Sequence, residues 1–203
     1  MHLTRRVFCG ALAAAAIVTI VVLGSASARA EDGKLTFLTL GKQSGFLELG
    51  SGAFALIGNE QKGRGRPTGE VNLDAVSGWD LVNFWDLMRV SPTIGGFLTA
   101  RGGIMGYAGL HGAIPIGDRV ELDPFTTLGA YGDGNGRDMG SKALFHVGLT
   151  GYYLFETGYR AGLTFAHESN AGLFPRDREH CTCNPSANDV LMTVGLPIDK
   201  LGF

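Results

Sequence analysis

Long hydrophobic runs are scarce in this chain of 203 residues. The apolar run at 11–23 is shorter than the roughly 20 residues that a helix needs to span a bilayer. It follows an arginine pair and precedes Ala28-Arg29-Ala30, which is the arrangement of a signal peptide and its cleavage site. We therefore expect export and removal of residues 1–30, and a single domain over 31–203.

Cysteine is also rare. Cys9 leaves with the signal peptide, and Cys181 and Cys183 lie one residue apart. In an oxidising periplasm these two can form a disulfide, although so small a ring is strained. His180 beside them would supply one metal ligand, but further ligands do not cluster there. We therefore expect no metal and no cofactor.

An excess of basic residues is absent as well. The 17 basic residues less the three in the signal peptide leave 14, against 19 acidic residues. An acidic mature chain gives no reason to expect a nucleic-acid partner.

Glycine, in contrast, is abundant, with 32 residues, and the mean hydropathy is positive at +0.13. Closed membrane barrels combine these properties, because their strands alternate lipid-facing and lumen-facing side chains and show no long apolar window. Period-two alternation between Gly, Asp and Asn clusters predicts an all-β fold, an eight-stranded antiparallel transmembrane barrel. The candidate strands are 44–58, 67–77, 90–101, 104–116, 119–132, 142–156, 159–170 and 188–199.

The connections agree with a barrel in the outer membrane. Tight turns are predicted at 117–118 and 156–158, and long polar loops at 59–66, 133–141 and 171–187, as expected for the two rims of such a barrel.

One connection fits poorly. The segment from Trp79 to Met88 is long for a periplasmic turn, and we expect either a short interfacial helix or part of an aromatic belt.

The faces of the strands distinguish two kinds of barrel. In 142–156, Leu149 and Tyr153 share an apolar face, whereas His146 and Thr150 share a polar one. A membrane barrel turns the apolar face to lipid, and a soluble sandwich or lipocalin buries it. The terminal Phe203 resembles the sorting signal of bacterial outer-membrane barrels. We therefore expect the outer membrane of a Gram-negative bacterium.

The strand at 159–170 carries a polar pair on its apolar side. His167 and Ser169 share the face of Leu163 and Phe165. Polar groups facing hydrocarbon cost free energy unless they are satisfied, so the pair indicates either a functional site or a rim position reached by water.

The sequence H-E-S-N-A-G at 167–172, followed by 184–198, resembles the lipid A 3-O-deacylase family, also called acyloxyacyl hydrolases. The resemblance implies an eight-stranded outer-membrane barrel that removes an ester-linked acyl chain from the lipid A of lipopolysaccharide. It also implies a Ser-His-Glu triad on the outer face of the barrel, with lipid as the partner.

Carried over by position, Ser169 is the nucleophile, His167 the general base and Asn170 a donor to the oxyanion. Asn188 occupies the position at which the family has Glu, and it shares the lipid-facing parity. Asp189 follows it and needs a bulge to reach the same face. Both residues stay open as the third member of the triad.

Other charged residues divide between substrate binding and structure. Lys62, Arg64 and Arg66, in the first outer loop, meet lipid A phosphates or are solvated loop charges. Inward-facing residues predicted to form a polar network in the lumen are Arg160, Glu168, His111 and His146. The competing hypothesis is a structural or adhesive barrel without activity, and a homodimer is compatible with either.

Overall fold

The computed structural model describes residues 36–39, 44–56, 67–85, 87–172 and 185–201. The predicted signal peptide lies outside these residues. The described strands are β1 (Thr36–Thr39), β2 (Phe46–Phe54), β3 (Thr68–Val76), β4 (Asp80–Phe84), β5 (Met88–Thr99), β6 (Ile104–Ile116), β7 (Val120–Gly132), β8 (Ala143–Leu154), β9 (Arg160–Ser169) and β10 (Ser186–Pro197). A short 3₁₀ helix, η1 (Ile198–Lys200), follows β10. Among the described residues, no helix is long and apolar enough to cross a membrane.

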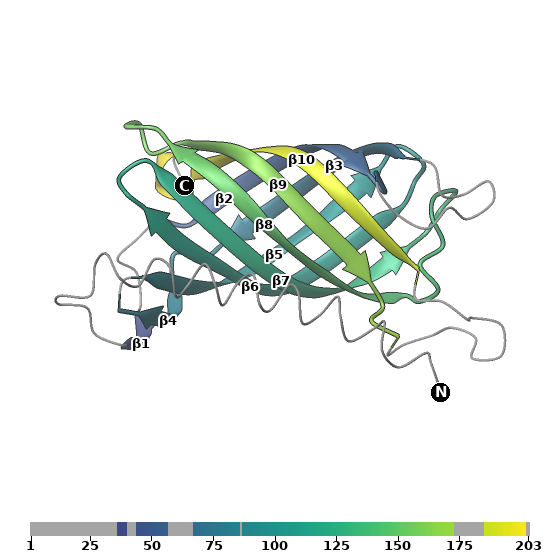
Figure 1. The fold of residues 1–203 in the computed structure, drawn as a ribbon, viewed down its shortest axis with the longest axis horizontal. Coiled ribbons are helices and arrows are strands. Elements are labelled where there is room, and N and C mark those ends of the chain that lie inside the picture. Colours follow the sequence, from purple (N-terminus) through teal and green to yellow (C-terminus); the bar gives the residue numbers. More distant parts are fainter. Residues whose placement is uncertain (1–35, 40–43, 57–66, 86, 173–184, 202–203) are drawn as a thin grey trace.

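Eight of these strands close into an antiparallel barrel, which confirms the predicted fold class (Figure 1). The order around the barrel is β2-β3-β5-β6-β7-β8-β9-β10, and β10 pairs again with β2. Closure gives every strand two hydrogen-bonded neighbours and leaves no open sheet edge in the wall. The predicted strand ranges agree with the described ones to within a few residues at each end.

The segment after β3 departs from one prediction. It forms β4, which pairs with the start of β5, and β1 pairs in turn with β4. An interfacial helix here is therefore wrong, because a tight turn, with Leu87 N donating to Phe84 O, folds the chain back as a hairpin. Trp79 and Trp85 at the two ends of β4 are 56 % and 49 % exposed, as expected for an aromatic belt.

The predicted alternation of faces is confirmed in the barrel strands. In β7, Val120 and Leu128 are exposed on the outer wall, whereas Glu121, Asp123 and Thr127 are buried inside. An apolar outer wall and a polar interior are the pattern of a membrane barrel and the reverse of a soluble one.

The lumen is filled with side chains. We call the end of the barrel at which β2 ends and β3 begins the outer mouth. An apolar cluster occupies it and consists of Phe54, Ala55, Phe97, Met105, Tyr107, Tyr131, Met139, Leu144 and Ala187. Polar and charged side chains fill the remainder, around cavities of about 20 and 30 Å³. Spaces of this size hold one or two water molecules and are too small for a lipid.

Candidate active site

The outer ends of β9 and β10 lie side by side and carry the predicted site. The two strands are antiparallel, with Ser169 opposite Ser186 and His167 opposite Asn188. β9 ends before Ala171, whose positive φ of 51° turns the chain out of the sheet. Residues directly opposite on one face have Cβ atoms about 5 Å apart. The register therefore brings Asn188 to His167.

His167 and Asn188 form a hydrogen bond, with 2.8 Å between Nδ1 and Oδ1. Because an amide oxygen can only accept, Nδ1 carries the proton and donates it. The other ring nitrogen, Nε2, then keeps its lone pair, which is the tautomer that a general base needs.

Ser169 lies two residues beyond His167 on the same face of β9 and is 8 % exposed. Positions two apart on a strand are separated by about 7 Å. Within the described residues His167 is hydrogen-bonded to Asn188 rather than to Ser169. Catalytic hydrogen bonds are often long in a free enzyme and shorten when the substrate binds. The pair thus has the residue types of a nucleophile and its base and lies on one face of the strand, but the two side chains are not hydrogen-bonded to each other.

Asp189, the other residue predicted for the third position, lies on the opposite face of β10. It is fully buried in the lumen, where its Oδ1 accepts a hydrogen bond of 2.9 Å from the backbone N of Ala55. Asp189 pairs with Ala166 in an unbroken register, so no bulge turns it outward. Of the two residues, only Asn188 reaches His167.

Asn170 is buried at the end of β9, and its amide is engaged on both sides. Nδ2 donates to the backbone oxygen of Met139 at 3.1 Å, and Oδ1 accepts from the backbone N of Gly172 at 2.7 Å. The second contact is a local turn typical of Asn. One N–H of Nδ2 is used by Met139, and an amide has two.

Below His167 the outer wall is apolar and open. Phe165, Leu163 and Met192 are 50 %, 62 % and 74 % exposed. They continue the face of His167 and Asn188 along β9 and β10, because Leu163 pairs with Met192 in the same register. We call these three residues the apolar strip.

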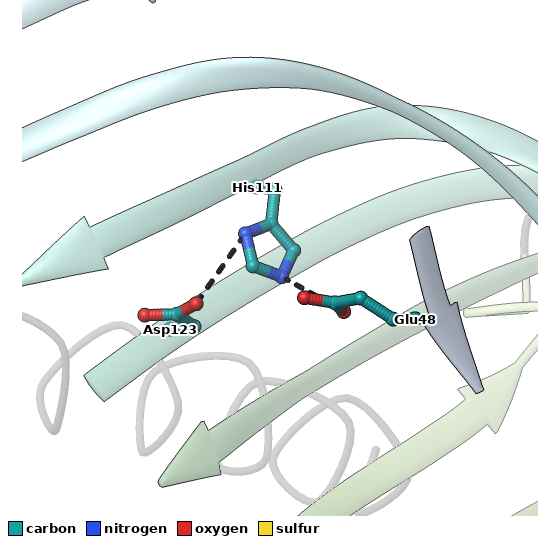
Figure 2. A group of neighbouring side chains, drawn as sticks. All are labelled: Glu48, His111 and Asp123. Atoms are coloured by element: carbon teal, nitrogen blue, oxygen red, sulfur yellow. Dashed lines mark ion pairs between the residues drawn. The ribbon is translucent and has the colours of Figure 1, made fainter. Parts of the chain in front are cut away.

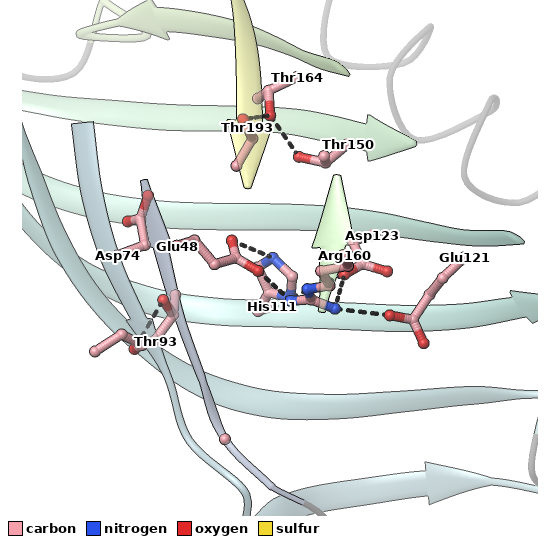
Figure 3. Close-up of polar contacts among 12 residues, drawn as sticks. Glu48, Asp74, Thr93, His111, Glu121, Asp123, Thr150, Arg160, Thr164 and Thr193 are labelled. Atoms are coloured by element: carbon pink, nitrogen blue, oxygen red, sulfur yellow. Dashed lines mark hydrogen bonds and ion pairs between the residues drawn. The ribbon is translucent and has the colours of Figure 1, made fainter. Parts of the chain in front are cut away.

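Inside the barrel, Arg160 is at the centre of a charged cluster (Figure 3). Its guanidinium donates to Glu121 at 2.7 Å, to Asp123 at 2.9 Å and to Glu48. His111 lies between Glu48 and Asp123, at N···O distances of 3.9 and 3.8 Å (Figure 2). The prediction that Arg160 and His111 point into the lumen is confirmed.

Glu48, His111 and Asp123 lie close enough to suggest a metal site, with one ligand atom from each within 4.8 Å of the others. The two carboxylates, however, face different nitrogens of the His111 ring, whereas a ligating imidazole offers one nitrogen to an ion. Arg160 also bonds both carboxylates, and its charge repels a cation. These residues fit an ion-pair network and not a metal centre.

The other inward residues complete the polar filling. A ladder of hydroxyls joins Thr150, Thr164 and Thr193 at 2.8 and 2.7 Å (Figure 3). His146 lies 3.3 Å from Glu168, and both are buried as predicted. These side chains connect β8, β9 and β10 on the lumen side of the candidate site.

Several predicted residues lie outside the described residues. They are Lys62, Arg64, Arg66, His180, Cys181 and Cys183. The interpretation of the first three as contacts for lipid phosphates stays a prediction.

The sequence interpretation missed Met139. Its carbonyl binds Asn170, and its side chain is fully buried in the outer mouth of the barrel. The available signal was that Met139 is the single apolar side chain in a predicted polar loop, 133–141, whose other members are Gly, Asp, Asn, Arg and Ser.

Comparison with known proteins yields no matching family model and no matching curated protein. Among solved structures, the outer membrane enzyme PagL has a TM-score of 0.55 and 18 % sequence identity, over 75 % of this chain and 99 % of PagL. This likeness is one of fold. The chain has the fold of an outer-membrane β-barrel. Neisserial surface protein A (NspA) has a TM-score of 0.48 and 8 % identity, over 76 % of this chain and 97 % of NspA. The outer membrane protein Ail of Yersinia pestis has a TM-score of 0.39 and 9 % identity, over 75 % of this chain and 99 % of Ail.

Replacing Arg160 with Met should lower the free energy of unfolding of this barrel by about 3–5 kcal/mol, because buried Glu48 and Asp123 lose their arginine partner and Glu121 keeps only Arg89, at 3.4 Å. Arg119→Met is the matched control. Arg119 pairs with Glu156 on the exposed surface, so its loss should leave stability unchanged. Urea unfolding in detergent micelles measures both. Destabilisation of the wild type by EDTA would contradict the ion-pair interpretation, because only a metal centre would respond to a chelator.

Proposed function

We propose that this protein is an outer-membrane ester hydrolase that removes an ester-linked acyl chain from lipid A or a related lipopolysaccharide lipid. The observation that carries the proposal is the 2.8 Å hydrogen bond between His167 and Asn188, on the lipid-facing wall and two residues from Ser169. The resemblance of 167–172 to the lipid A 3-O-deacylases and the fold shared with the outer membrane enzyme PagL support it.

In the proposed reaction Ser169 attacks the carbonyl carbon of the ester. A bond forms from Oγ to that carbon, and the Oγ proton passes to Nε2 of His167. The tetrahedral intermediate collapses as the bond to the sugar oxygen breaks, and His167 returns the proton to that oxygen. Water then attacks the acyl-serine with the same base, which releases a fatty acid and restores Ser169. The reaction needs no metal or cofactor.

Asn170 is the proposed donor to the negative oxygen of the intermediate. It directly follows Ser169, and the N–H of Nδ2 that Met139 does not take is assigned to this role. A single donor of this kind is worth about 10²- to 10³-fold in rate in serine hydrolases.

The apolar strip supports an acyl-lipid substrate. Phe165, Leu163 and Met192 offer an exposed surface that starts at His167 and runs towards the middle of the wall. An acyl chain lying along them stays in the hydrocarbon of the outer leaflet while its ester meets Ser169 at the rim. The substrate therefore reaches the site without leaving the membrane, and the reaction needs no lipid-binding cavity inside the barrel.

Lipid A carries phosphates, and the basic residues Lys62, Arg64 and Arg66 are proposed to bind them. A homodimer is neither required by this proposal nor excluded by it, because the catalytic groups come from one chain.

Mass spectrometry of lipid A from Gram-negative cells that express the protein tests the proposal. The wild type should remove one acyl chain, and Ser169→Ala should leave lipid A intact because the attacking oxygen is gone. Ser186→Ala is the matched control, since Ser186 pairs with Ser169 on the neighbouring strand. Unmodified lipid A in cells with a folded wild-type barrel would favour the structural or adhesive alternative.

A second prediction concerns the effect of Asn188 on kcat. An amide orients His167 but gives less stabilisation than a carboxylate to the imidazolium formed during the reaction. Asn188→Glu should therefore raise kcat, by at least about tenfold, within the roughly 10⁴-fold that the carboxylate contributes in serine proteases. Asn188→Leu should lower kcat below the wild-type value. Release of fatty acid from lipid A in micelles measures both, and an Asn188→Glu variant slower than Asn188→Leu would contradict the assigned role.

A further inference from the structure

The loop between β7 and β8, residues 133–142, crosses the outer mouth of the barrel. On one side, Asn135 N donates to Arg101 O in the β5–β6 turn at 3.0 Å. On the other, Asn170 Nδ2 donates to Met139 O at 3.1 Å at the end of β9. Strands β6, β7 and β8 lie between these two points on the wall. The loop is therefore a strap fastened on opposite sides of the mouth.

The strap is anchored in the mouth by Met139, whose side chain is fully buried in the apolar cluster with Phe54, Phe97 and Leu144. A second contact holds it nearby, because Tyr131 donates from its hydroxyl to the carbonyl of Arg137 at 2.9 Å. An unbranched side chain such as Met fills irregular space well. Burial of Met139 thus determines where its own carbonyl lies.

Gly140 shows how closely the strap approaches β9 and β10. Its φ is +67°, and a Cβ there would lie 3.3 Å from Pro185 Cδ and 3.4 Å from Asn170 Nδ2. A side chain at this position is therefore disfavoured by backbone strain and by contact. The strap lies directly against the residue that follows Ser169.

Asn170 connects the strap to the site. Gly172 N donates to its Oδ1 at 2.7 Å and Met139 O accepts from its Nδ2, so the plane of the amide and the sides of its oxygen and nitrogen are fixed. The remaining N–H of Nδ2 then has one direction. An oxyanion donor must be held in this way before the charge develops, because reorientation during the reaction costs rate.

We propose that Met139, buried in the mouth of the barrel, is a positioning residue that fixes the orientation of the amide of Asn170, the residue that follows Ser169 in the chain. This inference rests on the proposed esterase function. It makes an apolar side chain inside the barrel act on a site outside it, through one backbone carbonyl.

Kinetics provide the first test. Met139→Ala removes the buried side chain that anchors the strap, so kcat for the release of fatty acid from lipid A should fall by about 10- to 100-fold, less than the loss of the donor itself, because the amide is misplaced but still present. KM should change by less than about twofold, because the apolar strip that holds the acyl chain is untouched. Met139→Leu, which conserves volume, should restore kcat. Lys142→Ala is the control, an exposed side chain of the same strap.

Methionine oxidation by hydrogen peroxide, read by mass spectrometry of the protein in detergent micelles, provides a test without activity. In the wild type Met139 should be protected as well as Met105, which is buried in the same cluster and 1 % exposed. In Asn170→Ala the strap loses its fastening, and Met139 should oxidise faster while Met105 stays protected. Urea-unfolded protein gives the rate for full exposure.

The two tests distinguish failure of the positioning role from failure of the esterase function. Met139 oxidised at the unfolded rate in an active wild type, or full kcat in a folded Met139→Ala variant, would overturn this inference alone. Protected Met139 in a wild type that leaves lipid A intact would overturn the esterase function and, with it, the positioning role.

Discussion

A bilayer offers no hydrogen-bond partners, and the rest of this structure depends on that constraint. Closure of eight strands satisfies the backbone, and strict alternation then sends apolar side chains outward and polar ones inward. A polar residue on the outer wall must find a partner there. His167 and Asn188 satisfy each other across the β9–β10 pair. The same hydrogen bond that satisfies both polar groups on the outer wall also holds the imidazole in the tautomer that the proposed general base needs.

The filled interior of the barrel supports the candidate site on the outer wall. The lumen is filled from one end to the other by Arg160 with its three carboxylates, the threonine ladder and the strap residue Met139. The cavities among the described residues are the size of water molecules, so the proposed chemistry on a lipid is assigned to the outer wall. The filled interior also ties distant strands together, which keeps the positions of β9 and β10 fixed while one face of each meets a fluid membrane.

Most of the barrel is predictable from the sequence, because period-two alternation is a property of each strand by itself. The limits of β7, predicted at 119–132 and described at 120–132, show how well this works. Contacts between strands are less visible. Parity places Asn188 outward, but only the β9–β10 register shows that it meets His167. The β4 hairpin and the path of the strap depend on partners far along the chain, so neither the pairing of β4 with β5 nor the contact of Asn170 with Met139 could be predicted.

The central claim is that Ser169 is a nucleophile activated by His167 in the outer leaflet. A long-chain alkyl fluorophosphonate tests it most directly, because it phosphonylates an activated serine oxygen with loss of fluoride and carries an acyl-like chain for the apolar strip. The account predicts one adduct, mapped by peptide mass spectrometry to Ser169, which is lost in His167→Ala and retained in Ser186→Ala. An unlabelled Ser169 in the folded wild type, or labelling of Ser169 at the same rate in His167→Ala, would contradict it.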